Sequence, residues 1–172
     1  MPQDNENLGG QIPAGMTRQN FVTSALFDRT FDEGMALVEE TARYLDGRGR
    51  EEARALPRKA SMLYAGESMR VTTRLMQAAS WLLVQRAVRD GEMDCGLAAE
   101  ERYRLGSREV CLGVCAESTE MLPVALRDLL VRSDSLYRRI ARLDEVLFGD
   151  GAAASAGARE HQNRLAQAFG TD

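Results

Sequence analysis

The clearest pattern in the chain is a row of apolar residues that repeats every three or four positions near the C-terminal third. Seven of its eight positions are apolar, at alternating spacings of four and three. This spacing predicts an amphipathic helix that packs along its neighbours at a shallow angle. Ser118 or Thr119 is the predicted N-cap, Pro123 lies near the first turn, and Gly149 ends the helix. The eight positions are Leu122, Leu126, Leu129, Ser133, Leu136, Ile140, Leu143 and Leu147.

A second long helix is predicted over residues 17–46, with Thr17 as its N-cap. Its apolar residues are again three or four positions apart, which places them on one face. Gly47 and Gly49 are predicted to stop this helix, and a charged connector follows to Leu56. The predicted face consists of Phe27, Phe31, Met35, Val38, Ala42 and Leu45.

The helix predicted over residues 57–90 differs from the others because it carries two apolar stripes. Pro57 suits its first turn, and Gly91 follows its end. One stripe consists of Leu63, Val71, Leu75, Ala78, Leu82 and Val88, and the other repeats every seven residues as Met62, Met69, Met76 and Leu83. The helix is therefore either the central element or one that buries a second face against a partner. A methionine row is more often core than a binding groove, and both interpretations remain open.

Together these patterns predict an all-α fold, an elongated three-helix antiparallel bundle with a long irregular connector before the third helix. The connector, residues 91–121, contains four glycines and all three cysteines. Within it, residues 97–105 fit a short helix, and residues 106–119 show no sustained period. A connector of this length is uncommon inside a domain unless it has a function or is disordered.

The predicted bundle domain spans residues 17–148. Residues 1–16 are predicted to form a flexible N-terminal arm, because glycine, proline and polar residues dominate there. Residues 149–172 are predicted to form a flexible tail, which offers little besides Leu165 and Phe169 for burial.

The net charge of the chain limits the classes of partner that it is expected to bind. The chain has 172 residues and a formal net charge of −4. This charge argues against a general nucleic-acid or anionic-membrane binder, which would carry a basic surplus. Residues 54–90 are locally basic and include Arg70 and Arg74. They either pack beside acidic neighbours or form a surface for an acidic partner.

No pattern points to a reaction centre. His161 is the only histidine and lies in the predicted tail, and no phosphate-binding glycine loop is present. We therefore assign no catalytic, cofactor-binding or metal-binding residue and expect a non-enzymatic protein. Cys95, Cys111 and Cys115 read as reduced structural thiols, and a zinc or redox thiol site in residues 91–121 is kept as an alternative. The arginine-rich third helix leaves open a transcription-associated binding protein.

The chain has no signal-peptide pattern and no apolar run long enough for a membrane span, which requires about 20 residues. Together with the three thiols, these features predict a cytoplasmic protein that does not insert into membranes.

Four segments, in their order and spacing, resemble the RcdA family, which is named for regulation of CtrA degradation in alphaproteobacteria. They are FVTSALFDRTFDEGMALVEETARYLDG (residues 21–47), LPRKASMLYAGESMRVTTRLMQAASWLLVQRAV (56–88), YRLGSREVC (103–111) and LPVALRDLLVRSDSLYRRIARLDE (122–145).

The resemblance implies a small helical bundle that forms homodimers and has a flexible C-terminal tail. It implies an adaptor of the ClpXP protease that acts with CpdR-like and PopA-like accessory proteins on cargo such as CtrA, with a position at the cell pole. An adaptor tethers cargo to protease and raises their local concentration without chemistry. Residues expected to contact a partner or a second copy are Met62, Met69, Met76, Leu83, Arg70, Arg74, Leu165 and Phe169.

Overall fold

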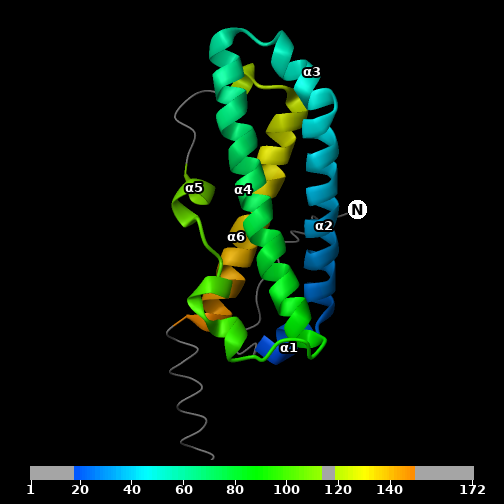
Figure 1. Cartoon of the computed structure of the whole chain (residues 1–172), viewed down its shortest axis with the longest axis vertical. Helices are drawn as coiled ribbons and strands as arrows, with labels where there is room; N and C mark the ends of the chain where they lie inside the picture. Colours follow the sequence, from blue (N-terminus) through cyan, green and yellow to red (C-terminus); the bar gives the residue numbers. More distant parts are fainter. Residues whose placement is uncertain (1–17, 114–118, 150–172) are drawn as a thin grey trace, which may run out of the picture.

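The computed structural model describes residues 18–113 and 119–149, and every regular element within these ranges is a helix. Three long helices form an elongated bundle, in which α4 packs against both α2 and α6 (Figure 1). The predicted all-α bundle is confirmed. The elements are α1 (Arg18–Val22), α2 (Ala25–Asp46), α3 (Arg48–Ala55), α4 (Arg58–Arg89), the 3-10 turns η1 (Leu97–Ala99) and η2 (Glu101–Tyr103), α5 (Arg108–Leu112), the 3-10 turn η3 (Thr119–Met121) and α6 (Val124–Phe148).

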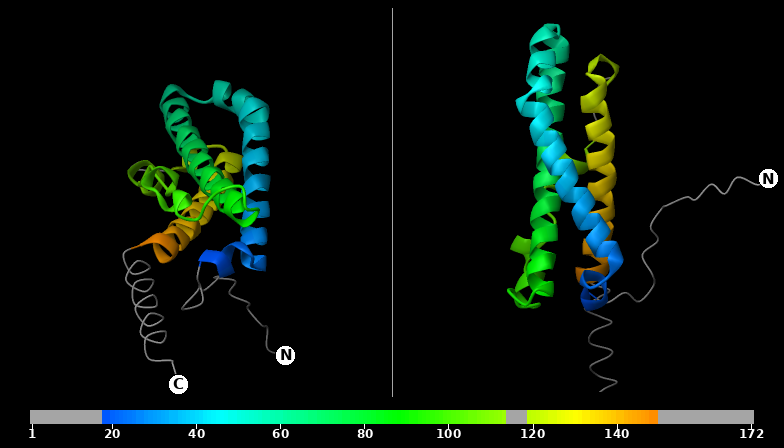
Figure 2. Two further views of the ribbon diagram at one scale, coloured as in Figure 1. Left: turned by 60° about the horizontal axis from the view of Figure 1, so that its bottom comes forward. Right: turned by 90° about the vertical axis from the view of Figure 1, so that its right-hand side faces the viewer.

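The direction of α6 differs from the prediction. Along α4, Arg74 pairs with Asp134 and Trp81 bonds to Asp144, so α4 and α6 run in the same direction. Only α2 is antiparallel to both, and Figure 2 shows it inclined across the other two. A parallel return requires a crossover, and the long segment between α4 and α6 provides it. The prediction of an antiparallel bundle is therefore wrong for α4 and α6, which are parallel.

The first predicted helix is broken near its start. Ser24 interrupts it between α1 and α2, and the Ser24 hydroxyl oxygen accepts a hydrogen bond from the Phe27 amide at 3.3 Å, as an N-cap does. At the other end, Gly47 is the C-cap of α2 as predicted. Gly49 is not a stop, however, because it lies inside α3, which occupies the predicted connector. The predicted N-cap Thr17 lies outside the described residues.

The buried face of α2 is offset from the predicted one. Phe27 belongs to both faces, but Ala42 is exposed, and Phe31, Met35, Val38 and Leu45 are only partly buried. The residues on the buried line are Phe27, Thr30, Gly34, Leu37 and Thr41. A glycine and two threonines in this line allow close helix approach, which a pattern based on hydrophobicity does not register.

Gly34 marks the closest approach of α2 to the rest of the bundle. A Cβ atom there would lie 2.8 Å from Leu82 Cδ1 and 3.7 Å from Leu136 Cδ2. We expect Gly34→Val to lower the free energy of unfolding by about 1–3 kcal/mol, because the core has no room for the added methyl groups. Urea titration followed by circular dichroism measures this change.

Gly66 is the matched control for this glycine, since it lies inside α4 on an exposed face and a Cβ atom would meet nothing within 4 Å. Gly66→Ala should raise stability by up to about 1 kcal/mol through helix propensity alone. Equal effects of both substitutions would contradict the close packing at Gly34.

The apolar row of α6 is confirmed in full. All eight predicted positions are buried, including Ser133, whose hydroxyl group donates to the Leu130 carbonyl oxygen at 3.1 Å. The helix itself begins at Val124, with Pro123 as N-cap and η3 before it. The row faces α4 and α2, so its residues form part of the core between the three long helices.

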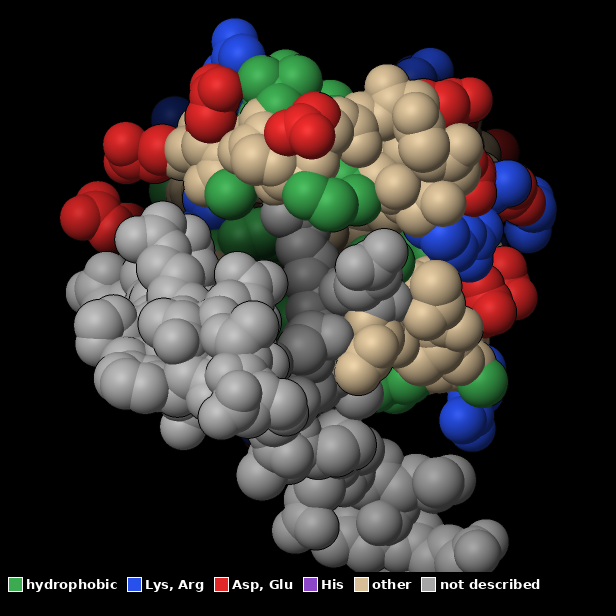
Figure 3. Space-filling view, turned by 90° about the horizontal axis from the view of Figure 1, so that it is seen from below, with side chains coloured by type: hydrophobic (Ala, Val, Ile, Leu, Met, Phe, Trp, Pro, Cys, Tyr) green, Lys and Arg blue, Asp and Glu red, His purple; other side chains and the backbone are tan. Residues whose placement is uncertain are grey.

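Aromatic residues close the end of the bundle at which α6 ends. Phe21 in α1 is fully buried and stacks edge-on against Phe27, with ring centroids 5.6 Å apart. Trp81 of α4 lies 6.0 Å from the Phe21 ring. Seen from this end, charges of both signs surround patches of apolar side chains (Figure 3). The described surface visible there is therefore not a patch of a single charge.

Candidate functional site

The methionine row of α4 lies on the surface. Met62, Met69, Met76 and Leu83 are 70%, 71%, 58% and 51% exposed. The interpretation of this row as core is therefore wrong, and the interpretation as a surface for another protein remains. The other predicted stripe of α4 supplies the core, since Val71, Leu75, Ala78 and Leu82 are all buried.

An apolar groove runs beside this row, between α2 and α4, with a volume of about 450 Å³. Val38, Ala42 and Leu45 of α2 form one wall. These residues belong to the face of α2 that the sequence assigned to the core. Met76 and Leu83 form part of the opposite wall. The two helices thus share one apolar surface, which we call the α2–α4 groove.

Residues between the methionines are small. Ala65, Thr72 and Ala79 lie three residues after Met62, Met69 and Met76, on the same face of α4. Large and small side chains therefore alternate along the helix at the three-four spacing of a helix-packing seam. A partner helix that packs along this face could therefore place its side chains between the large residues of α4.

Arg74, one of the two predicted contact arginines, is not available to a partner. Its side chain is 6% exposed and pairs with Asp134 at 2.9 Å. Its guanidinium group also donates to the carbonyl oxygens of Cys111 at 2.7 Å and Leu130 at 3.2 Å. Burial lowers the pKa of Arg74, and the nearby Asp134 carboxylate opposes that shift. Arg74 therefore serves to hold α5 against α4 and α6.

Arg70 acts one turn earlier on α4. It donates to the Gly113 carbonyl oxygen at 3.1 Å and lies 3.4 Å from the buried Glu67 carboxylate. Its side chain remains 22% exposed. Part of its guanidinium group thus bonds to the connector, and the rest remains accessible at the surface.

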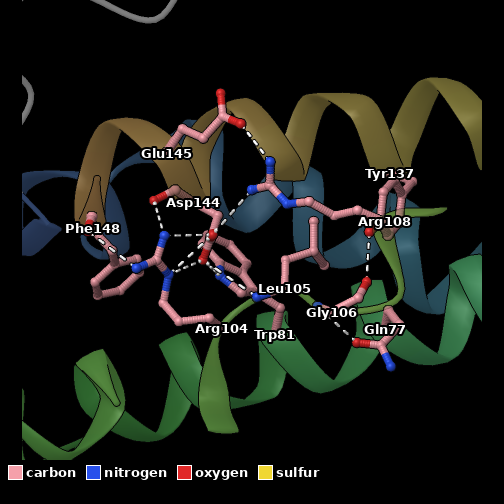
Figure 4. Close-up of polar contacts among 10 residues, drawn as sticks. All are labelled: Gln77, Trp81, Arg104, Leu105, Gly106, Arg108, Tyr137, Asp144, Glu145 and Phe148. Atoms are coloured by element: carbon pink, nitrogen blue, oxygen red, sulfur yellow. Dashed lines mark hydrogen bonds and ion pairs between the residues drawn. The ribbon is translucent and has the colours of Figure 1, made fainter. Parts of the chain in front are cut away.

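Lower on the bundle, the connector is fixed by Asp144, a buried acid of α6 that is 1% exposed (Figure 4). Its carboxylate accepts hydrogen bonds from Trp81 Nε1 at 2.9 Å and from Arg104 Nε and Nη2 at 2.9 Å. The Leu105 amide donates to it at 3.5 Å, and Arg108 lies 3.6 Å away. One carboxylate therefore joins α4, α6 and the connector.

The next contact of the connector is made by its backbone. The Tyr137 hydroxyl group donates to the Gly106 carbonyl oxygen at 2.6 Å, and the Gly106 amide donates to Gln77 Oε1 at 3.1 Å (Figure 4). Burial raises the pKa of Tyr137 above its ordinary value. From Gln77 to Arg74 and Arg70, successive turns of α4 hold successive parts of the connector.

The sequence analysis did not single out Asp144. Its neighbour Leu143 belongs to the predicted seam, so the only available signal was its position beside that seam. Nothing in the sequence distinguished Asp144 from exposed acids of the same helix such as Asp128.

Most arginines of α6, on which the transcription-associated alternative rests, are paired with acids. Arg132 binds Glu40 of α2 through two nitrogens, at 2.7 and 2.8 Å, and the hydrogen bond from Arg132 lowers the pKa of Glu40. Arg139 pairs with Glu33, and Arg138 with Asp134 at 2.7 Å. The Arg132 and Arg139 pairs link α6 to α2, whereas the Arg138 pair lies within α6. None of these three arginines is a free cation, and they give the transcription-associated alternative no support.

The thiols do not form a metal site within the described residues, where no group of three His, Cys, Asp or Glu side chains is placed to hold an ion. Cys95 is exposed and Cys111 is buried. Burial raises the pKa of Cys111. Cys115 and His161 lie outside the described residues, as do the predicted contacts Leu165 and Phe169 and the predicted arm and most of the tail.

Known proteins match the chain over most of its length. A family model described as "Protein of unknown function (DUF1465)" matches residues 18–169. The crystal structure of RcdA from Caulobacter crescentus CB15 is 52% identical in sequence and has a TM-score of 0.62, with 76% of this chain and 97% of that chain covered. The chain belongs to the RcdA family. No protein of the curated set shows a significant match.

The RcdA relationship confirms the resemblance seen in the sequence. RcdA is named for regulation of CtrA degradation, which places it in regulated proteolysis and the cell cycle by name. In the part of the chain that is described, no helix combines the length and the apolar character that crossing a membrane requires.

Proposed function

We propose that this chain is a non-enzymatic, dimeric adaptor in the ClpXP-dependent degradation of cell-cycle regulators of the CtrA type. The observation that carries the proposal is the 52% identity with RcdA over 97% of that chain. By the same relationship, its partners are CpdR-like and PopA-like accessory proteins, and it acts in the cytoplasm of an alphaproteobacterium, at the cell pole.

The exposed face of α4 that carries Met62, Met69, Met76 and Leu83, which we call the α4 face, supports the dimer in this proposal. Its four large side chains are more than half exposed, and they border an apolar groove. Contiguous apolar surface of this kind normally marks an interaction site in a soluble protein. A second copy of α4 is a fitting occupant, because an isologous contact places the same alternating large and small residues on both sides.

The crossover supports the adaptor role in a different way. An adaptor needs two separable surfaces on one stable body, so that cargo and protease are held together at a high effective concentration. The connector is held to α4 and α6 by Arg104, Gly106 and Arg74 contacts, on a different side of α4 from the α2–α4 groove. One bundle therefore presents a groove and a crossover surface that can be occupied separately.

A reconstituted degradation reaction tests this function. Purified ClpXP, a CpdR-like protein, a PopA-like protein with cyclic di-GMP and a CtrA-type cargo are incubated with and without the full chain. We expect the rate of cargo loss to rise at least several-fold when the chain is present. Bovine serum albumin at the same concentration is the control for crowding. An unchanged rate with all accessory proteins present would contradict the proposal.

A further inference from the structure

A second groove, between α4 and α6, has the opposite character to the apolar one. Its volume is about 480 Å³, and the charged residues that line it carry a surplus of two positive charges, four arginines against two acids. The chain as a whole carries −4. We call this feature the α4–α6 groove; its charged residues are Glu67, Arg70, Arg74, Arg127, Asp134 and Arg138.

Both acids of this groove are already neutralised from within it. Glu67 lies 3.4 Å from Arg70, and Asp134 is held by Arg74 at 2.9 Å and by Arg138 at 2.7 Å. Arg127 has no such partner, and its Nε atom is buried without a hydrogen bond. A buried, unpaired donor on a cation is costly. The groove therefore holds a positive charge that the described residues leave uncompensated.

The groove also has an apolar component. Leu130 and Val131 belong to its lining. On α6, Val124, Arg127, Val131, Asp134 and Arg138 follow one another at spacings of three and four residues, so they share a face. Val124 and Val131 are 71% and 69% exposed. Exposed apolar side chains and arginines thus share one surface, on which Asp134 is already paired with Arg74 and Arg138.

This combination selects one chemical class of partner. Guanidinium groups pair with carboxylates through two parallel hydrogen bonds, and the exposed valines offer apolar contacts about two turns apart. Among the described residues, the lining includes no aromatic residue on which a nucleotide base could stack and no lysine. We propose that the α4–α6 groove binds an acidic, amphipathic segment of a partner protein, with its carboxylates on Arg127, Arg138 and the exposed part of Arg70.

This inference deepens the proposed function and rests on it for its biological role, because it names the chemistry of a second partner surface. The binding itself does not require ClpXP. A display library of random 12-residue peptides, selected on the full chain, tests it directly. We expect the selected peptides to be enriched in Asp and Glu interleaved with apolar residues.

Fluorescence anisotropy with the best selected peptide then measures the contribution of each arginine. Arg127→Ala and Arg138→Gln should each weaken binding by about tenfold or more, as expected for loss of a charge-assisted hydrogen bond. Arg43→Ala removes the same charge from an exposed position on α2 and should change binding less than twofold. Circular dichroism tests whether each variant is folded. If Arg127→Ala does not fold, Arg138→Gln alone measures the contribution of the groove.

Three results would overturn the inference. Selected peptides without acidic residues would do so, as would peptides whose binding is unchanged in both groove variants but lost in Met76→Glu. The third result combines a selection that yields no acidic peptides with a melting experiment. If millimolar pyrophosphate then raises the melting temperature of the wild type but not that of Arg127→Ala, the groove is a phosphate site instead. A negative result here leaves the degradation assay standing, and failure of that assay leaves peptide binding standing.

Discussion

Replacing Asp144 with alanine is expected to lower the free energy of unfolding by about 3–5 kcal/mol, the usual effect of removing one partner of a buried ion pair. The carboxylate is 1% exposed, and it accepts hydrogen bonds from Trp81, Arg104 and Leu105. Without it, an indole N–H and a backbone amide lose their acceptor, and the partly buried Arg104 loses its counter-ion. The loss is a large part of the 5–15 kcal/mol that stabilises a typical domain.

Urea titration at one fixed protein concentration measures this loss, since the stability of a dimer depends on concentration. Hydrogen exchange adds a local measurement. The amides of Leu105 and Gly106 should exchange faster in the variant even under native conditions, because the connector loses its anchor.

Asp128→Ala is the matched control on the same helix. Asp128 is 57% exposed, and within the described part of the chain it pairs only with Arg132, which also binds Glu40. We expect a change below about 1 kcal/mol, as for other surface ion pairs. If Asp144→Ala and Asp128→Ala cost the same, Asp144 is not the anchor of the crossover.

Substitution of Met76 by glutamate is expected to convert the proposed dimer into a monomer while leaving the helix content unchanged. A dimer interface at the α4 face would bring two copies of the new carboxylate into an apolar contact, where burial of unpaired charge is strongly unfavourable. We expect the dissociation constant to rise at least about 100-fold, which corresponds to about 2.7 kcal/mol. Light scattering after size-exclusion chromatography should then show 19.0 kDa, the mass of one chain.

Met69→Glu should act in the same way, since Met69 is 71% exposed on the same face. Val146→Glu is the control, because Val146 is 44% exposed on α6 and lines neither the α2–α4 groove nor the α4–α6 groove. Circular dichroism excludes unfolding as the cause of any change in mass. A Met76→Glu protein that retains the mass of a dimer would place the interface elsewhere.

The sequence predicted the elements best where apolar residues alone form the buried line. All eight predicted seam positions are buried, seven of them in α6 and Leu122 just before it, because leucine and isoleucine at the three-four spacing leave the helix only one face to bury. On α2 the prediction chose the wrong line. Thr30, Gly34 and Thr41 are buried because small side chains let the helices approach. Periodicity of apolar residues cannot detect that.

The candidate site was predicted in part. The two stripes of α4 correctly indicated surplus apolar surface, but the pattern could not say which stripe faces solvent, since both are equally periodic. Arg74 was expected at a partner surface and is instead buried against Asp134 and the connector. Asp144 was not predicted at all, because burial of a charge depends on partners such as Arg104, forty residues away. The direction of α6 depends on the same long-range contacts.

The rate at which ClpXP degrades a CtrA-type cargo in the presence of wild-type, Met76→Glu and Val146→Glu chains tests most directly whether the α4 face joins proteins during delivery. All three reactions contain the same accessory proteins and the same concentration of folded chain. We predict that wild type and Val146→Glu accelerate cargo loss equally, whereas Met76→Glu leaves the rate near that without any chain. Full acceleration by a folded, monomeric Met76→Glu chain would contradict this account.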